Sequence, residues 1–114
     1  MKLVYICSPY IGSGTNKTDR LQNIVDAQHF CDIAIKKYGV IPIAPHAYFT
    51  QFLCDDIPEQ RELGLRMAKE MLSLCHEVWI FASDGVSDGM KAEIQLAKNI
   101  GIPGIFKNWV CESI

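Results

Sequence analysis

Four short apolar runs recur along the chain, and each is bounded by Gly, Pro, Ser or Asp. They are rich in Val, Ile and aromatic residues and do not alternate with polar ones. This pattern is typical of parallel strands that are covered on both faces of a sheet. The runs are Leu3–Cys7, Val40–Ala44, Val78–Ala82 and Pro103–Phe106. We therefore predict a strand in each run.

Three stretches between these runs repeat apolar residues at steps of three and four, the spacing of one helix face. The first ends before Gly39, and the second begins at Pro58. The third spans about Gly89 to Ile100 and stops at Gly101. In the second helix the predicted inward stripe is Leu63, Met67, Met71 and Leu74. Strands and helices thus alternate along the chain.

The alternation predicts an α/β fold, a three-layer sandwich built on a parallel sheet of four or five strands. Right-handed crossovers give the strand order 2-1-3-4, with the switch point between the first and third strands. Residues 1–114 show no internal repeat and no domain boundary, so we expect a single domain. The least regular segments are Ser8–Thr18 and Pro45–Pro58. Both follow the carboxyl end of a strand, where such sheets bind ligands.

Composition narrows the class of protein. With 49% hydrophobic and 21% charged residues, the chain should fold, and its net charge of -2 argues against a binder of nucleic-acid polymers. Its apolar runs are too short for a membrane span or a signal peptide, so we expect a cytoplasmic protein with no membrane partner. Five scattered cysteines form no C-x-x-C pair. We therefore expect reduced thiols, no metal site and no cofactor.

Three segments at strand ends should meet at one edge of the sheet: Cys7–Tyr10, Pro45–Tyr48 and Ser83–Gly89. The last contains two glycines and leads into the third helix, whose free N–H groups favour an anion such as a phosphate. Alternatively, Ser87 or Asp88 only caps the helix. The candidate substrate-binding residues are Ser8, Pro9, His46, Asp84, Ser87, Gly89 and Met90.

Glu93 interrupts an otherwise apolar or small stripe of the third helix. The other members of that stripe are Met90, Ile94, Ala97, Ile100 and Gly101. Burying a carboxylate without a partner is costly, so Glu93 needs a partner or a function. The alternative is a glutamate that complements the helix dipole and leans toward solvent.

Two motifs carry a family resemblance. They are Val4-Tyr5-Ile6-Cys7 and Ser87-x-Gly89-Met90-x-x-Glu93-x-x-x-Ala97-x-x-x-Gly101-Ile102-Pro103. Together they resemble the nucleoside 2-deoxyribosyltransferase superfamily, which includes deoxynucleoside-monophosphate N-glycosidases. The segment Pro42–Leu53 resembles a small branch of it whose biochemistry is not established. The resemblance covers nearly the whole chain and implies a flavodoxin-like fold, although only the segments around Tyr5 and Glu93 resemble the characterised enzymes.

The resemblance implies a catalytic mechanism. Glu93 would attack the anomeric carbon of a nucleoside or nucleotide, expel the base and form a glycosyl-enzyme ester that water or a second base resolves. Tyr5 would hold the nucleophile or the sugar, so we expect it within reach of Glu93. Ser87 would contact the 5' end of a nucleotide. The relatives complete their pockets across subunits, which implies a homo-oligomer.

The chain also departs from the family pattern. Tyr10–Gly12 stand where the monophosphate hydrolases carry an arginine, and Lys69 or Glu70 stands in place of an aspartate that contacts the base. Residues that could replace this aspartate as a proton donor are His46, Asp55 and Asp56. We predict an N-glycosidase or a deoxyribosyltransferase. The alternatives are a nucleotide-binding sensor without turnover and an oligomeric scaffold.

Overall fold

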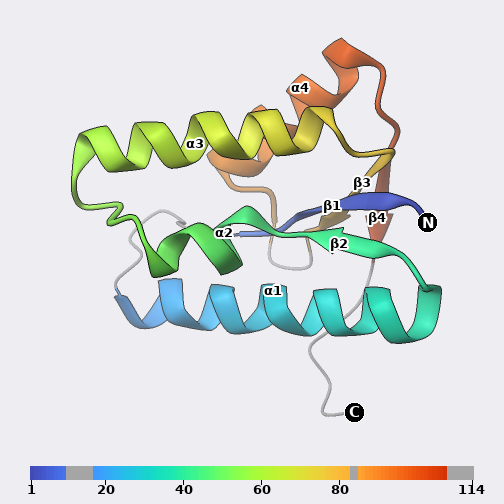
Figure 1. The fold of residues 1–114 in the computed structure, drawn as a ribbon, viewed down its shortest axis with the longest axis horizontal. Coiled ribbons are helices and arrows are strands. Elements are labelled where there is room, and N and C mark those ends of the chain that lie inside the picture. The colour runs from blue at the N-terminus through green and yellow to red at the C-terminus, as the bar shows by residue number, and fades with distance from the viewer. Residues whose placement is uncertain (10–16, 83–84, 108–114) are drawn as a thin grey trace.

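The computed structural model describes residues 1–9, 17–82 and 85–107, in which a parallel sheet lies between helices (Figure 1). The strands are β1 (Leu3–Cys7), β2 (Ile41–Ile43), β3 (Glu77–Phe81) and β4 (Gly104–Lys107). The helices are α1 (Lys17–Tyr38), α2 (Pro45–Tyr48), α3 (Pro58–Ser73) and α4 (Asp88–Ile100), with a 3-10 turn η1 (Phe49–Gln51). Each predicted strand and helix is present, with ends shifted by a few residues.

The four strands are ordered β2-β1-β3-β4, and all three neighbouring pairs are parallel. The α/β fold and the order 2-1-3-4 predicted from the sequence are confirmed. Tyr5 of β1 lies beside Ile43 of β2 and Val78 of β3. The carboxyl ends of the strands therefore meet at one edge, where the chain leaves β1, β2 and β3 toward the predicted site segments.

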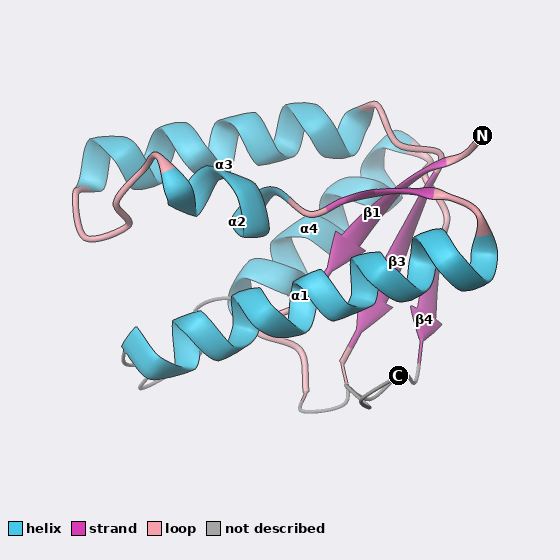
Figure 2. Cartoon of the chain, turned by 60° about the horizontal axis from the view of Figure 1, so that its bottom comes forward, coloured by secondary structure: helices cyan, strands magenta, loops and turns pink. Residues whose placement is uncertain are grey.

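Helices cover both faces of the sheet (Figure 2), and each face has its own cluster of buried side chains. On one face α1 packs against β1 and β3, and the ring of Phe30 stacks on that of Phe81 at 4.0 Å between centroids. On the other face α3 and α4 cover the sheet. The buried residues of this second cluster are Tyr5, Cys7, Leu72, Cys75, Val78, Ile80, Met90 and Ala97. Because side chains alternate along a strand, Tyr5 and Cys7 both face α4.

Helix ends follow the sequence signals. Gly39 and Gly101, directly after α1 and α4, have φ angles of 64° and 80°, a left-handed conformation that glycine adopts without strain. At the start of α4, the Ser87 hydroxyl accepts a hydrogen bond from the Met90 N–H at 3.2 Å. Ser87 is thus an N-cap. Among the described helices, none combines the length and the apolar character needed to cross a membrane.

The segment predicted to be irregular, Pro45–Pro58, is partly helical. It contains α2, which begins at Pro45, a residue suited to the first helical turn, and η1, which follows it directly. The Thr50 hydroxyl also donates to the His46 carbonyl at 2.6 Å, and this contact holds the two short helices together.

The predicted inward stripe of α3 is wrong at both ends. Leu63 is 39% exposed and Leu74 is 71% exposed, whereas Leu72 is completely buried. The part of α3 before Leu72 packs beside α2 rather than over the centre of the sheet (Figure 1). On α4, similarly, Ile100 is 45% exposed although the stripe placed it inside.

Candidate active site

Glu93 points from α4 toward β1, where two side chains contact its carboxyl group. The Tyr5 hydroxyl donates a hydrogen bond to Oε2 of Glu93, and the Cys7 Sγ lies 3.7 Å from Oε1. The contact between Tyr5 and Glu93 is the one expected from the sequence. Glu93 does not lean toward solvent, so its interpretation as a simple partner of the helix dipole is wrong.

The surroundings of Glu93 keep its two neighbours protonated. Burial raises the pKa of Glu93 to about 7, against the two hydrogen bonds, which favour the charged form. Burial and the nearby Glu93 charge raise the pKa of Tyr5 well above 10.0. They also raise the pKa of the Cys7 thiol far above its usual value. Any negative charge in this cluster therefore resides on Glu93, and the phenol and thiol remain donors.

Ser8 and His46 form a second contact at the same edge of the sheet. Ser8 directly follows β1 and is 4% exposed, while His46 lies on α2, just after β2. The Ser8 Oγ lies 3.4 Å from the His46 Nε2. Burial lowers the pKa of His46 to about 4, although nearby Asp55 opposes the shift. His46 is therefore neutral at pH 7 and offers one ring N–H rather than a cationic acid.

The other predicted site residues are spread along the same edge. Pro9 and Ser87 are partly buried, and Gly89 is exposed at the first turn of α4. Met90 is 1% exposed and packs inside the core cluster, against the Cys7 side of β1. Asp84 lies outside the described residues, as do Tyr10, Ile11, Gly12 and Ser83.

The two candidate aspartates differ in their surroundings. Asp56 is exposed and forms an ion pair with Arg20 at 3.1 Å, whereas Asp55 is partly buried. Lys69 and Glu70 of α3 are exposed. Neither residue of α3 therefore supplies a buried acid, which agrees with the departure seen in the sequence.

Sequence reasoning missed Cys7 as a neighbour of Glu93. The available signal was its spacing, because Cys7 lies two residues after Tyr5 and so shares its face of β1. A cysteine in a buried strand otherwise looks like any other core residue. Among the described residues, no group of His, Cys, Asp and Glu is arranged to hold a metal ion.

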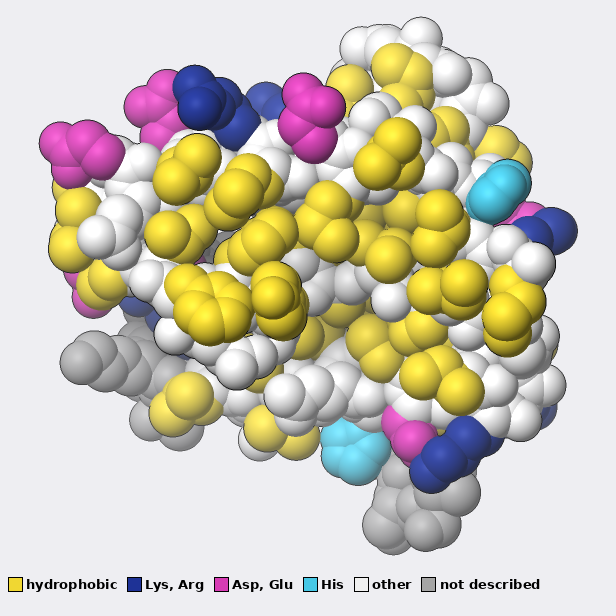
Figure 3. Space-filling view, in the orientation of Figure 1, with side chains coloured by type: hydrophobic (Ala, Val, Ile, Leu, Met, Phe, Trp, Pro, Cys, Tyr) yellow, Lys and Arg dark blue, Asp and Glu magenta, His cyan; other side chains and the backbone are white. Residues whose placement is uncertain are grey.

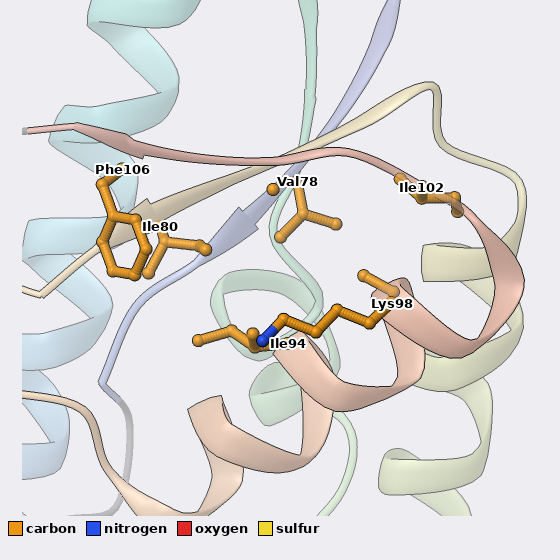
Figure 4. A pocket seen from close by; sticks show the side chains of 8 residues that line it. Val78, Ile80, Ile94, Lys98, Ile102 and Phe106 are labelled. Carbon is orange, nitrogen blue, oxygen red and sulfur yellow. The ribbon is translucent and has the colours of Figure 1, made fainter.

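Described residues line two hollows, but neither is lined by Tyr5 or Glu93. One, of about 130 Å³, lies between β3, β4 and α4 (Figure 4). Its lining is apolar except for Lys98, which extends along it beside Ile94. The other, of about 320 Å³, is lined by Cys31, Pro42, Ile43, Ala44, Pro45, Ala47, Tyr48 and Met71. This second hollow adjoins α2, the helix that carries His46.

A comparison with solved structures finds a protein with a similar fold. The chain is similar in structure to a 2-deoxyribosyltransferase of the psychrotolerant bacterium Bacillus psychrosaccharolyticus, with a TM-score of 0.66 and 13% identity. The match covers 96% of this chain and 77% of the other. This similarity confirms at the level of the fold the resemblance recognised in the two motifs.

The sequence comparisons are less specific about function. No curated protein matches the chain. A family model described as a domain of unknown function (DUF7768) matches residues 2–107, which include the whole described sheet and its helices. The chain therefore belongs to the DUF7768 family of domains.

Proposed function

We propose that this protein cleaves or exchanges the N-glycosidic bond of a nucleoside or nucleotide, with Glu93 as nucleophile and Tyr5 as its positioning partner. The observation that carries the proposal is the contact of the Tyr5 hydroxyl with the partly buried Glu93 carboxylate, at the ligand-binding edge of the sheet. The fold shared with a 2-deoxyribosyltransferase supports it.

The first step forms a glycosyl-enzyme ester. A lone pair of the ionised Glu93 carboxylate forms a C–O bond to the anomeric carbon as the C–N bond breaks. The electrons of the C–N bond leave with the base nitrogen, which takes up a proton from water. The transition state resembles an oxocarbenium ion, so the negative charge of Glu93 stabilises it. Tyr5 stays protonated and fixes the orientation of the carboxyl group.

The second step releases the sugar. If water attacks the anomeric carbon, the C–O bond to Glu93 breaks, the free sugar forms and one proton returns to solvent. If the nitrogen of a second base attacks, the C–O bond to Glu93 breaks, the proton of that nitrogen goes to solvent, a new nucleoside forms and the protein is a transferase. Both routes restore the Glu93 carboxylate, as in retaining glycosidases.

Residues at the edge of the sheet would hold the substrate. We assign the sugar or phosphate to the turn from Ser87 to Gly89, because the first N–H groups of α4 lie there. Ser8, Pro9 and the neutral His46 would contact the base or sugar from the ends of β1 and β2. Met90 would support this turn from the core.

A panel of nucleosides and nucleotides tests the proposal. Each compound is incubated with the protein, with and without a second free base, and released base is measured by chromatography. Base release in water alone identifies a hydrolase, and release that requires the second base identifies a transferase. Glu93→Gln is the matched control. Equal release by wild type and Glu93→Gln would overturn the proposal.

The alternative is a nucleotide-binding sensor without turnover. The exposed Lys69 and Glu70 favour it, because they stand where the related enzymes carry an aspartate that contacts the base. The same panel distinguishes the two functions. Binding by calorimetry without base release from any compound would support the sensor.

We also propose that the protein associates with copies of itself. The apolar face, defined as Ile41, Tyr48, Phe52, Leu63 and Leu74, supports association because each of these residues is at least 39% exposed. Figure 3 shows apolar side chains gathered over α3, α2 and β2. Exposed apolar surface of this kind is typical of interaction sites.

We further propose that the protein is cytoplasmic. The free thiols of Cys7, Cys31, Cys54 and Cys75 suit a reducing compartment.

A further inference from the structure

The Cys7 thiol is placed to donate a hydrogen bond to Glu93. Its side chain is completely buried, and its sulfur lies 3.7 Å from Oε1 of Glu93 and 3.9 Å from the Met90 carbonyl oxygen. Hydrogen bonds from sulfur are long, and an ionised acceptor is favoured over a neutral carbonyl. When Glu93 is charged, its Oε1 is thus the preferred acceptor.

The two oxygens of Glu93 have different donors. Oε2 accepts from the phenol of Tyr5, a strong donor, whereas Oε1 faces the thiol of Cys7, a weak one. Both donors come from one face of β1, two residues apart. The two donors on β1 therefore fix the plane of the carboxyl group. They also leave Oε1 with a weaker hydrogen bond, and so with more electron density, than Oε2.

We propose that Cys7 is a positioning residue for Glu93, and that Oε1, the oxygen facing Cys7, attacks the anomeric carbon in the reaction proposed above. A strong donor withdraws electron density from the oxygen that it binds, so Oε2 is the weaker nucleophile. When Oε1 forms the C–O bond, the C–N bond breaks and its electrons leave with the base. Oε2 becomes the ester carbonyl and keeps its hydrogen bond from Tyr5.

Other groups near Glu93 do not take this role. Among the described residues packed against α4, Cys75 follows α3 and donates its thiol to the Met71 carbonyl at 3.3 Å. Lys107 of β4 lies over Trp79 on the opposite face of the sheet, 4.3 Å from the ring centroid. The Lys98 side chain extends along the hollow between β4 and α4. The ionisation of Glu93 therefore depends on burial, Tyr5 and Cys7.

The pKa of Glu93 can be measured directly, without any substrate. Carbon-13 NMR of protein labelled at the glutamate carboxyls follows each carboxyl through a pH titration, and Glu93→Gln identifies the signal of Glu93. Cys7→Ala removes a donor that favours the charged form, so the pKa of Glu93 should rise by about half a unit. Cys7→Ser supplies a stronger donor and should lower it.

Cys75→Ala is the matched control, because it removes a buried thiol from the same core cluster without touching Glu93. We expect no change in the pKa of Glu93 in this variant. An unchanged pKa in Cys7→Ala, or an equal rise in Cys75→Ala, would overturn the role of Cys7. If Cys7→Ala does not fold, a higher pKa in the nearly isosteric Cys7→Ser overturns it instead.

Kinetics test the assignment of the attacking oxygen. At about pH 9, where Glu93 is ionised in every variant, Cys7→Ser should lower kcat about tenfold with KM unchanged, because the hydroxyl holds Oε1 more tightly. A normal kcat would overturn the assignment of Oε1. Expected pKa shifts without base release by the wild type would support the contact between Cys7 and Glu93 and refute the proposed function.

Discussion

In the proposed reaction Glu93 loses its proton before it attacks the sugar, and its pKa of about 7 places this ionisation near neutral pH. We therefore expect kcat/KM for base release to fall about tenfold for each pH unit below 7 and to level off above it. A steady-state pH profile with the best substrate of the panel checks this. An acid limb near pH 4.5, the usual range of a glutamate, would mean that another group ionises or that Glu93 is not buried during turnover.

The pH dependence of stability should contain two opposing contributions. The folded-state pKa of Glu93 is raised, so its contribution is present below about pH 4.5 and is lost as the pH rises to 7. The folded-state pKa of His46 is lowered, so its contribution is present above about pH 6.5 and is lost as the pH falls toward 4. The two nearly cancel in the wild type between about pH 5 and 6.5.

Variants separate these contributions. Over the same window the free energy of unfolding should rise with pH by about 2 kcal/mol more in Glu93→Gln than in the wild type. In His46→Gln the free energy of unfolding should instead fall with pH over this window, by about 2 kcal/mol relative to the wild type. Urea unfolding at several pH values measures both slopes. Parallel slopes in all three proteins would show that neither group has the pKa that burial implies.

Glu93 was identifiable from the sequence because a carboxylate stands out on an apolar stripe. For Cys7 the sequence offered only its spacing from Tyr5, and its contact with Glu93 becomes visible in the structure. His46 was a candidate, but its contact with Ser8 joins two residues that are 38 positions apart in the chain and follow different strands. Contacts of this kind depend on the geometry of the sheet edge, which local patterns do not encode.

At the scale of elements, the first turn of α4 carries the helix cap and is also the proposed binding site for a phosphate or sugar. Ser87 accepts from the Met90 N–H, so Ser87→Ala should lower the free energy of unfolding by about 1 kcal/mol. Ser87→Asp keeps a capping oxygen and should restore stability. If this turn holds a phosphate, the negative charge of Ser87→Asp should weaken the binding of a nucleoside monophosphate more than tenfold relative to the wild type, although the cap is kept.

Thermal melts and calorimetry with a nucleoside and its monophosphate separate the two roles of Ser87. Unchanged monophosphate affinity in Ser87→Asp would remove the phosphate from this turn and leave Ser87 as a cap alone. Nucleoside affinity serves as the control, because it should hardly respond to the added charge.

Strands and long helices were predictable because each has a strong local signal. Buried apolar runs indicated the four strands, and Gly39, Pro58 and Gly101 indicated helix ends. The short helix α2 shows no helical period in its four residues. The stripe of α3 was assigned to the core because a 3.6-residue period shows which face is apolar, not what covers it.

At the scale of the whole molecule, the apolar face should be covered by a second copy. Phe52→Glu, which adds a charge beside Tyr48, should shift the protein toward a monomer. Phe106→Glu is the matched control, because Phe106 has the same 64% exposure but lies on β4, at the other edge of the sheet. Light scattering across a concentration series reports the mass. A wild type that stays monomeric, or equal effects of both variants, would contradict association through the apolar face.

Trapping the glycosyl-enzyme tests the assignment of Glu93 most directly. Nucleosides with fluorine at C2 of the sugar slow both steps, because fluorine destabilises the oxocarbenium-like transition state, and a reactive leaving base allows the ester to accumulate. Mass spectrometry of the digested wild type should find the mass of the fluorinated sugar on the peptide that contains Glu93. Glu93→Gln should gain no mass. A sugar attached to another residue, or base release by the wild type with no adduct at any time, would contradict Glu93 as the nucleophile.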